Sequence, residues 1–219
     1  MLFSQNVAVD FGPVADYVGA ADYLALLLVA IWGAYCCVIL WRRIGQLQFA
    51  NEDEQDAFLD EVQTQLTQNK INELTEICDD DPRALPQLVL VGLKKRQLPI
   101  PKLRTALTER FQRDVMAELD YRASWIQTII KAAPMLGLFG TVLGMMGAFG
   151  KLSAATEISP DKLAADIMFA LITTAIGLSI AIPLVLATAS INVKIGRLED
   201  FVGSGLTRLV EIFGGRGEG

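Results

Sequence analysis

Three threonines and one aspartate attract attention because they place hydroxyl and carboxyl groups in or beside strongly apolar segments. Thr141 lies within one such segment, Thr173 and Thr174 lie within another, and Asp166 directly precedes the second. Oxygen atoms of this kind can hold a proton or a cation where water is scarce. The chemistry that these residues suggest is therefore ion binding and transfer.

If both segments are helices, these groups fall on narrow faces built from small residues. At about 100° per residue, Thr141 shares one side of its helix with small residues, while the large side chains lie elsewhere around it. On the other helix, Asp166, Thr173, Thr174 and Thr188 share an arc of roughly 100° with small residues. In lipid, small residues let helix backbones approach closely. The small residues are Ala133, Pro134, Gly137, Gly140, Gly144 and Ala148 on the first face, and Ala170, Gly177 and Ala181 on the second.

The spacing leaves two interpretations open. In the first, both faces are seams where helices pack, and the hydroxyl groups bond back to the preceding turn. In the second, Thr141 and Thr174 line a water-accessible pore between subunits. The apolar runs 23–41, 132–149 and 167–193 contain no charged residue, so a proton that crosses the bilayer would need an ionisable group from a partner.

The elements that must hold these residues are membrane-spanning helices. The chain is 52% hydrophobic and has a mean hydropathy of +0.38, which is too apolar for an ordinary soluble domain of 219 residues. A span needs about 20 apolar residues, and three runs satisfy this. We expect transmembrane helices at residues 23–41, 125–150 and 167–193, with a bend near Pro183.

Basic residues predict the orientation. The stretch from Arg42 to Arg122 holds 12 Lys and Arg residues, whereas residues 1–22 hold none. By the positive-inside rule, residues 1–22 and the loop 151–166 lie outside, while residues 42–124 and the tail 194–219 lie in the cytoplasm. The leader does not fit a cleavable signal, because it lacks a basic segment.

The cytoplasmic residues 44–124 are charged and favour helices, with one slip of the apolar spacing near Asn69. Between Lys102 and Pro134 there is neither proline nor glycine, so we expect one helix to run from the cytoplasm into the second span. Ser159 and Pro160 should begin the third helix, which should continue past Val193 toward Phe201. The acidic run 52–56 is most simply a solvated face.

Composition argues against several classes of protein. The net charge of −6 argues against a nucleic-acid partner, and the absence of histidine excludes imidazole chemistry. Cys36, Cys37 and Cys78 have no disulfide or zinc spacing and are interpreted as small apolar residues. We therefore expect no enzyme, no catalytic residue, no cofactor and no metal site.

Two motifs resemble the ExbB/TolQ/MotA family of proton-channel subunits. APMLGLFGTVLGMMGAF at residues 133–149 is similar to the second span of that family, and ALITTAIGLSIAIPLV at residues 170–185 is similar to the third. The three-span topology fits ExbB and TolQ, whereas MotA relatives have four spans.

The resemblance implies a bacterial inner-membrane pentamer whose second and third spans line a central pore. Within the pore it implies a dimer of a single-span partner resembling ExbD, TolR or MotB, which supplies an aspartate. Proton flow would then drive mechanical work on the cell envelope. Thr141 and Thr174 match the pore threonines of the family, and Pro134 and Pro183 match its prolines near the span ends.

One position departs from the pattern. ExbB and TolQ usually carry a glutamate five residues before the threonine of the third span, and this chain has Phe169 there. Asp166 could act as an ion acceptor at the outer mouth, or it could simply favour the start of the helix. A sodium-driven, MotA-like stator and a scaffold that conducts nothing remain the alternatives.

Overall fold

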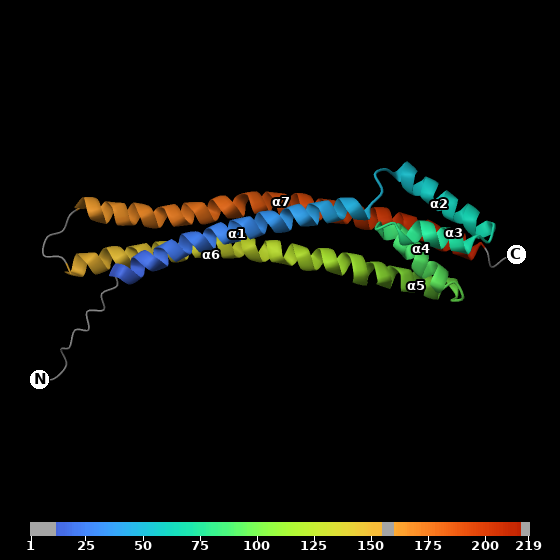
Figure 1. Cartoon of the computed structure of the whole chain (residues 1–219), viewed down its shortest axis with the longest axis horizontal. Helices are drawn as coiled ribbons and strands as arrows, with labels where there is room; N and C mark the ends of the chain where they lie inside the picture. The colour runs from blue at the N-terminus through green and yellow to red at the C-terminus, as the bar shows by residue number, and fades with distance from the viewer. Residues whose placement is uncertain (1–11, 155–159, 216–219) are drawn as a thin grey trace, which may run out of the picture. The chain divides into compact units, whose positions relative to one another are not determined.

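The computed structural model describes residues 12–154 and 160–215, and most of them form helices joined by short connections (Figure 1). No strand occurs among these residues, so the all-α prediction is confirmed. The helices are α1 Gly12–Leu47, α2 Glu52–Thr67, α3 Ile71–Asp79, α4 Ala84–Lys94, α5 Ile100–Phe111, α6 Ala117–Ala154 and α7 Pro160–Gly214, with a π-helical turn at Gln112–Met116.

Three helical stretches are long and apolar enough to cross a bilayer, as expected of a membrane protein. They are Ala20–Leu47, Ile100–Gly150 and Leu163–Gly214. The last two are more than twice the length that a hydrocarbon core requires. Each therefore extends well beyond one span.

Both long helices are continuous, as the sequence predicts. α5, the π turn and α6 follow one another without a gap, and α7 passes Val193 and Phe201. The two helices also remain helical through their internal prolines, Pro134 and Pro183. α7 begins at Pro160, while the expected cap residue Ser159 lies outside the described residues.

Contacts divide the chain into two units, of which the first is called the apolar unit. It comprises Met1–Cys37 and Trp125–Ala187, and within it α1, α6 and α7 run side by side (Figure 1). A Cβ atom at Gly33 of α1 would lie 2.8 Å from Leu184 of α7 and 3.1 Å from Ile129 of α6. α1 thus packs against both other helices at this level.

The outer side of α1 carries large apolar side chains that the described residues leave exposed. A bilayer would cover these groups, which water would not accept as one continuous patch. They are Leu24, Leu27, Leu28, Ile31, Trp32 and Tyr35, each between 55% and 61% exposed.

The second unit, called the charged unit, comprises Val38–Ser124 and Thr188–Gly219. Its α7 segment packs against α2 and α4, since Gln55 donates a hydrogen bond to the carbonyl of Phe201 at 3.2 Å and Leu85 contacts Gly205. Arg208 forms ion pairs with Asp56 and Asp60 of α2. The core beneath is mainly leucine, including Leu59, Leu74, Leu103, Leu107, Leu119, Leu198 and Leu209.

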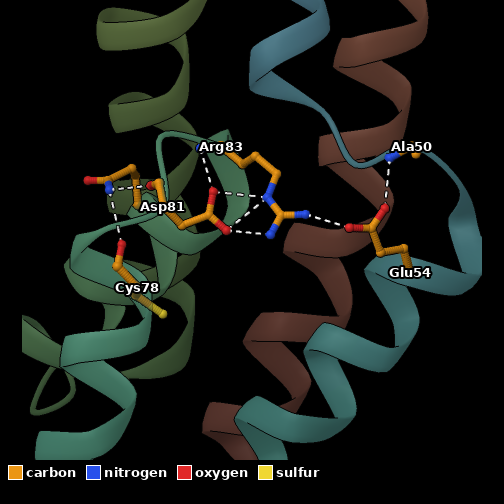
Figure 2. Close-up of polar contacts among 6 residues, drawn as sticks. Ala50, Glu54, Cys78, Asp81 and Arg83 are labelled. Atoms are coloured by element: carbon orange, nitrogen blue, oxygen red, sulfur yellow. Dashed lines mark hydrogen bonds and ion pairs between the residues drawn. The ribbon is translucent and has the colours of Figure 1, made fainter.

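Arg83 connects three parts of the charged unit (Figure 2). Its Nε lies 2.9 Å from Asp81 Oδ1, its Nη1 lies 2.7 Å from Glu54 Oε1, and its guanidinium lies 3.9 Å above the Phe49 ring. Glu54 also accepts a hydrogen bond from the backbone of Ala50. Burial alone would raise the pKa of Asp81, but hydrogen bonds from the Arg83 side chain and backbone, together with its charge, lower it below the ordinary 3.8.

Candidate functional site

The seam between α6 and α7 is built on direct backbone contact at two glycines. A Cβ atom at Gly137 would lie 2.6 Å from the carbonyl oxygen of Thr173, and one at Gly177 would lie 2.5 Å from that of Ala133. Real Cβ atoms do not approach backbone oxygens so closely. Only glycine therefore permits this approach of the two helices.

Two further glycines extend the same seam along α6. A Cβ atom at Gly144 would meet the Cβ of Ala170 at 2.7 Å, and one at Gly140 would meet the hydroxyl oxygen of Thr173 at 2.6 Å. Ala170 and Thr173 are each only 1% exposed. The small-residue faces inferred from the sequence thus face each other within one chain.

Threonine hydroxyl groups fasten this seam. The Oγ1 of Thr174 donates to the carbonyl of Gly137 at 2.9 Å. The Oγ1 of Thr173 lies 3.1 Å from the same carbonyl and 2.7 Å from that of Ala170. In a bilayer these bonds satisfy hydroxyl groups that lipid cannot.

The predicted ion-path residues differ in their exposure. Thr173 is buried in the seam, whereas Thr141, Thr174 and Asp166 are half-buried. Thr141 donates to the carbonyl of Leu138 in its own helix at 2.7 Å. Thr173 is thus enclosed by its own chain, and the other three retain surface that another subunit or water could reach.

The residues predicted to serve packing and bends also have defined places. Ala181 is buried at 6% exposure. The Cα of Pro134 lies beside Gly177, 3.3 Å from where a Cβ atom would stand, whereas Pro183 is exposed. Phe169, at the position where the sequence departs from the resembled family, packs edge-on against Tyr23 of α1, with ring centroids 5.1 Å apart.

Asp22 is a polar residue at this site that the sequence reasoning missed. It is 4% exposed and lies in the candidate span Ala20–Leu47, although the predicted span begins at residue 23. Its Oδ2 would lie 2.4 Å from a Cβ atom at Gly140. The three helices therefore enclose a carboxyl group, and the expectation that only a partner could bring one into the membrane needs correction.

A sequence profile described as the MotA/TolQ/ExbB proton channel family matches residues 81–202. This stretch is more than half of the chain. It includes the whole α6–α7 seam but not Asp22.

Individual proteins show the same similarity. TolQ, a Tol-Pal system protein of Haemophilus influenzae, is 40% identical over 86 residues, which are 39% of this chain and 38% of that protein. The biopolymer transport protein ExbB of Neisseria gonorrhoeae is 34% identical over 95 residues, 43% of each chain. A biopolymer transport protein ExbB homolog of Methanothermobacter thermautotrophicus is 25% identical over 203 residues, 91% of this chain and 69% of that protein. The matches to TolQ and to the Neisseria ExbB thus span about two-fifths of those relatives.

Proposed function

Since the chain belongs to the MotA/TolQ/ExbB proton channel family, we propose that it is the ion-conducting subunit of an inner-membrane motor. The motor converts the proton motive force into mechanical work on the cell envelope. One proton crossing 100 mV releases about 2.3 kcal/mol, which is the energy available for that work.

The proposed assembly contains five copies of this chain around a single-span partner. That partner resembles ExbD, TolR or MotB and carries an aspartate in its span. The N-terminal segment lies outside, and residues 42–124 and the C-terminal tail lie in the cytoplasm, because Arg42 and Arg43 follow the first span directly.

The observation that supports this function is the unequal exposure of the threonines. Thr173 is enclosed by its own chain, but Thr141 and Thr174 are half-buried at the same seam. A hydroxyl oxygen that donates to a carbonyl keeps lone pairs for another donor. We therefore assign Thr141 and Thr174 to the pore wall that faces the partner's aspartate, with Asp166 as an acceptor at the outer mouth.

The test begins with co-purification of the chain and the small single-span protein encoded beside it, followed by proton-flux measurements on the complex in lipid vesicles. Thr174→Val should lower flux at least tenfold and leave assembly intact, while Thr174→Ser, which keeps the hydroxyl, should restore it. Thr207→Val is the matched control, because that hydroxyl donates to Gly203 in the charged unit. Undiminished flux in Thr174→Val would refute the assignment.

Asp166→Asn separates its two possible roles. A lower flux supports the acceptor at the mouth, and an unchanged flux assigns Asp166 to helix initiation. A sodium gradient in place of the proton gradient, applied to the same vesicles, tests the sodium-driven alternative.

A scaffold that conducts nothing is the second candidate, favoured by the complete enclosure of Thr173 in the α6–α7 seam. The two functions differ in their need for an ion gradient. Cellular activity that survives an uncoupler, in a strain that depends on this chain, would favour the scaffold.

A further inference from the structure

Asp22 is the one described residue of the apolar unit whose side chain leaves a fully buried oxygen without a hydrogen-bond partner. Its exposure is 4%, so water reaches almost none of it. Burying an ionised carboxylate without a partner is costly enough that such groups take up a proton instead. The donors and acceptors around this oxygen indicate which protonation state of Asp22 they favour.

The site around Asp22 is formed by all three helices of the apolar unit. Asp22 Oδ2 and Thr173 Oγ1 lie 2.4 Å and 2.6 Å from the same point, the position of a missing Cβ atom at Gly140. Two oxygens from α1 and α7 thus converge on one point beside α6. A larger residue in place of Gly140 would keep them apart.

The hydrogen bonds of Thr173 determine which form of Asp22 suits this site. The single hydroxyl proton of Thr173 is already directed to the carbonyls of Gly137 and Ala170, so it is not available to an ionised carboxylate. The oxygen of Thr173 can still accept a hydrogen bond. A protonated Asp22 has an acceptor in this oxygen, whereas an ionised Asp22 finds no free donor in Thr173.

Other titratable groups near Asp22 are few. On α1 its neighbour is Tyr23, and on α7 Asp166 lies two turns before Thr173. On α6 no titratable residue occurs between Lys131 and Lys151. Neither Tyr23 nor Asp166 supplies a positive charge that would hold Asp22 ionised.

A metal cation suits the site less well than a proton. Cations such as Ca²⁺ take six or more oxygen ligands, and the described residues contain no group of three or more His, Cys, Asp or Glu side chains arranged to hold an ion. A proton needs only the carboxylate oxygen and one acceptor.

We propose that Asp22 is a proton-binding residue of this chain, which takes up and releases a proton beside Thr173 and Gly140 as ions cross the membrane. Uptake converts the carboxylate into a carboxylic acid that donates to the Thr173 hydroxyl oxygen, and release restores the carboxylate. The inference rests on the proposed function for its role in conduction. It adds an ionisable group from α1 to the path formed by α6, α7 and the partner.

Infrared spectroscopy on the full chain in lipid vesicles tests the proton itself, with no need for a partner or for conduction. At neutral pH the wild type should show the carbonyl band of a protonated carboxyl group. The band should be lost in Asp22→Asn and retained in Asp161→Asn, which removes an exposed carboxyl of the same unit. A wild-type spectrum without this band, or one that Asp22→Asn leaves unchanged, overturns the proposal.

Proton flux through the complex tests the role of that proton. Asp22→Asn should lower flux at least tenfold with an unchanged thermal midpoint, because Asn has nearly the same shape and can donate to Thr173 as the protonated acid does. Normal flux in Asp22→Asn, beside the loss of flux in Thr174→Val, overturns this inference alone. Normal flux in both variants refutes the proposed function as well, and the infrared band still reports whether Asp22 binds a proton. Flux that follows sodium rather than pH overturns the choice of proton.

Discussion

In the apolar unit the helices meet through glycine backbones, whereas in the charged unit they meet through leucine side chains and arginine. Gly137 and Gly177 bring the backbones of α6 and α7 into direct contact. In the charged unit Arg208 pairs with two carboxylates of α2, and Arg83 pairs with Glu54 of α2 and with Asp81 of its own connection. Lipid provides no hydrophobic driving force for the association of helices. Close backbone packing therefore holds the apolar unit together, whereas apolar burial and ion pairs hold the charged unit together.

The comparison predicts that one added methyl group is the most harmful change in the apolar unit. Gly177→Ala places a Cβ atom 2.5 Å from the Ala133 carbonyl, which cannot rotate away as a side chain could. We expect a loss of about 3 kcal/mol, at the upper end for overpacking, seen as a lower thermal midpoint of the purified chain in detergent. In the control Gly203→Ala the new methyl meets nothing within 4 Å. That variant should gain about 0.5–1 kcal/mol, and equal midpoints for the two variants would contradict the comparison.

In the charged unit the corresponding change is the loss of one charge. Arg83→Met leaves Asp81, whose side chain is only 14% exposed, without its partner, and should cost about 1–3 kcal/mol. Hydrogen exchange in α3 and α4 of the full chain should become faster. Arg83→Lys should exchange at a rate between those of the wild type and Arg83→Met, because lysine keeps the charge but lacks the planar guanidinium group. Lys70→Met removes a pair in which both side chains are about half exposed. It should change exchange by much less, and an equal effect would contradict the role of Arg83.

Acid should loosen the charged unit through the same cluster. The Arg83 hydrogen bonds and charge outweigh burial and lower the pKa of Asp81 below 3.8. Its stabilisation is therefore complete above the unfolded value and is lost as pH falls through the lower folded value. Hydrogen exchange in α3 and α4, corrected for its intrinsic pH dependence, should accelerate only below about pH 4. Asp81→Asn should remove this acid response, and a response that persists in the variant would assign it to another group.

The smallest effect concerns Cys78 in the core of the charged unit. Burial, with smaller contributions from the charges of Asp81 and Glu61, raises its pKa to about 12. The reactive thiolate is thus nearly absent at pH 8. A maleimide should label Cys78 only after denaturant is added, as mass spectrometry of its peptide would show. Rapid labelling of the native chain would mean that the leucine core opens easily, which would weaken the contrast between the units.

Much of this arrangement follows from the sequence. The absence of charge over long runs predicts three spans, and the helical spacing of small residues predicts which sides of α6 and α7 are slim. The slip in spacing near Asn69 also has a structural counterpart. α2 ends at Thr67, α3 begins at Ile71, and Asn69 between them has a φ of 60°.

The sequence could not assign the threonines to their environments. Thr173 and Thr174 are neighbours on one arc, and which of them is enclosed depends on how far α7 is rotated toward α6. The spacing of residues in one helix does not predict how that helix is rotated about its axis relative to its neighbour. It is set by the glycine contacts with the other helix.

Asp22 was missed for a different reason. A search for runs without charge must stop at a charged residue, so it begins the span at residue 23, directly after Asp22, whereas the candidate span begins at Ala20. A signal was nevertheless present, because Asp22 stands four residues before Leu26 and eleven before Gly33, on the same side of α1. Leu26 is 1% exposed, and Gly33 is buried.

The π turn at Gln112–Met116 changes the spacing between buried residues along this helix of the charged unit. Leu103, Leu107 and Phe111 are buried at steps of four residues, and the next buried residue, Met116, follows after five. A wide turn accommodates one surplus residue, so the apolar stripe stays aligned on both sides of it. Deleting a single residue from this turn would leave an ordinary α-helix with the stripe still aligned, because the buried positions would again follow at steps of four. Deleting one from the regular helix on either side would instead rotate everything before it by about 100°.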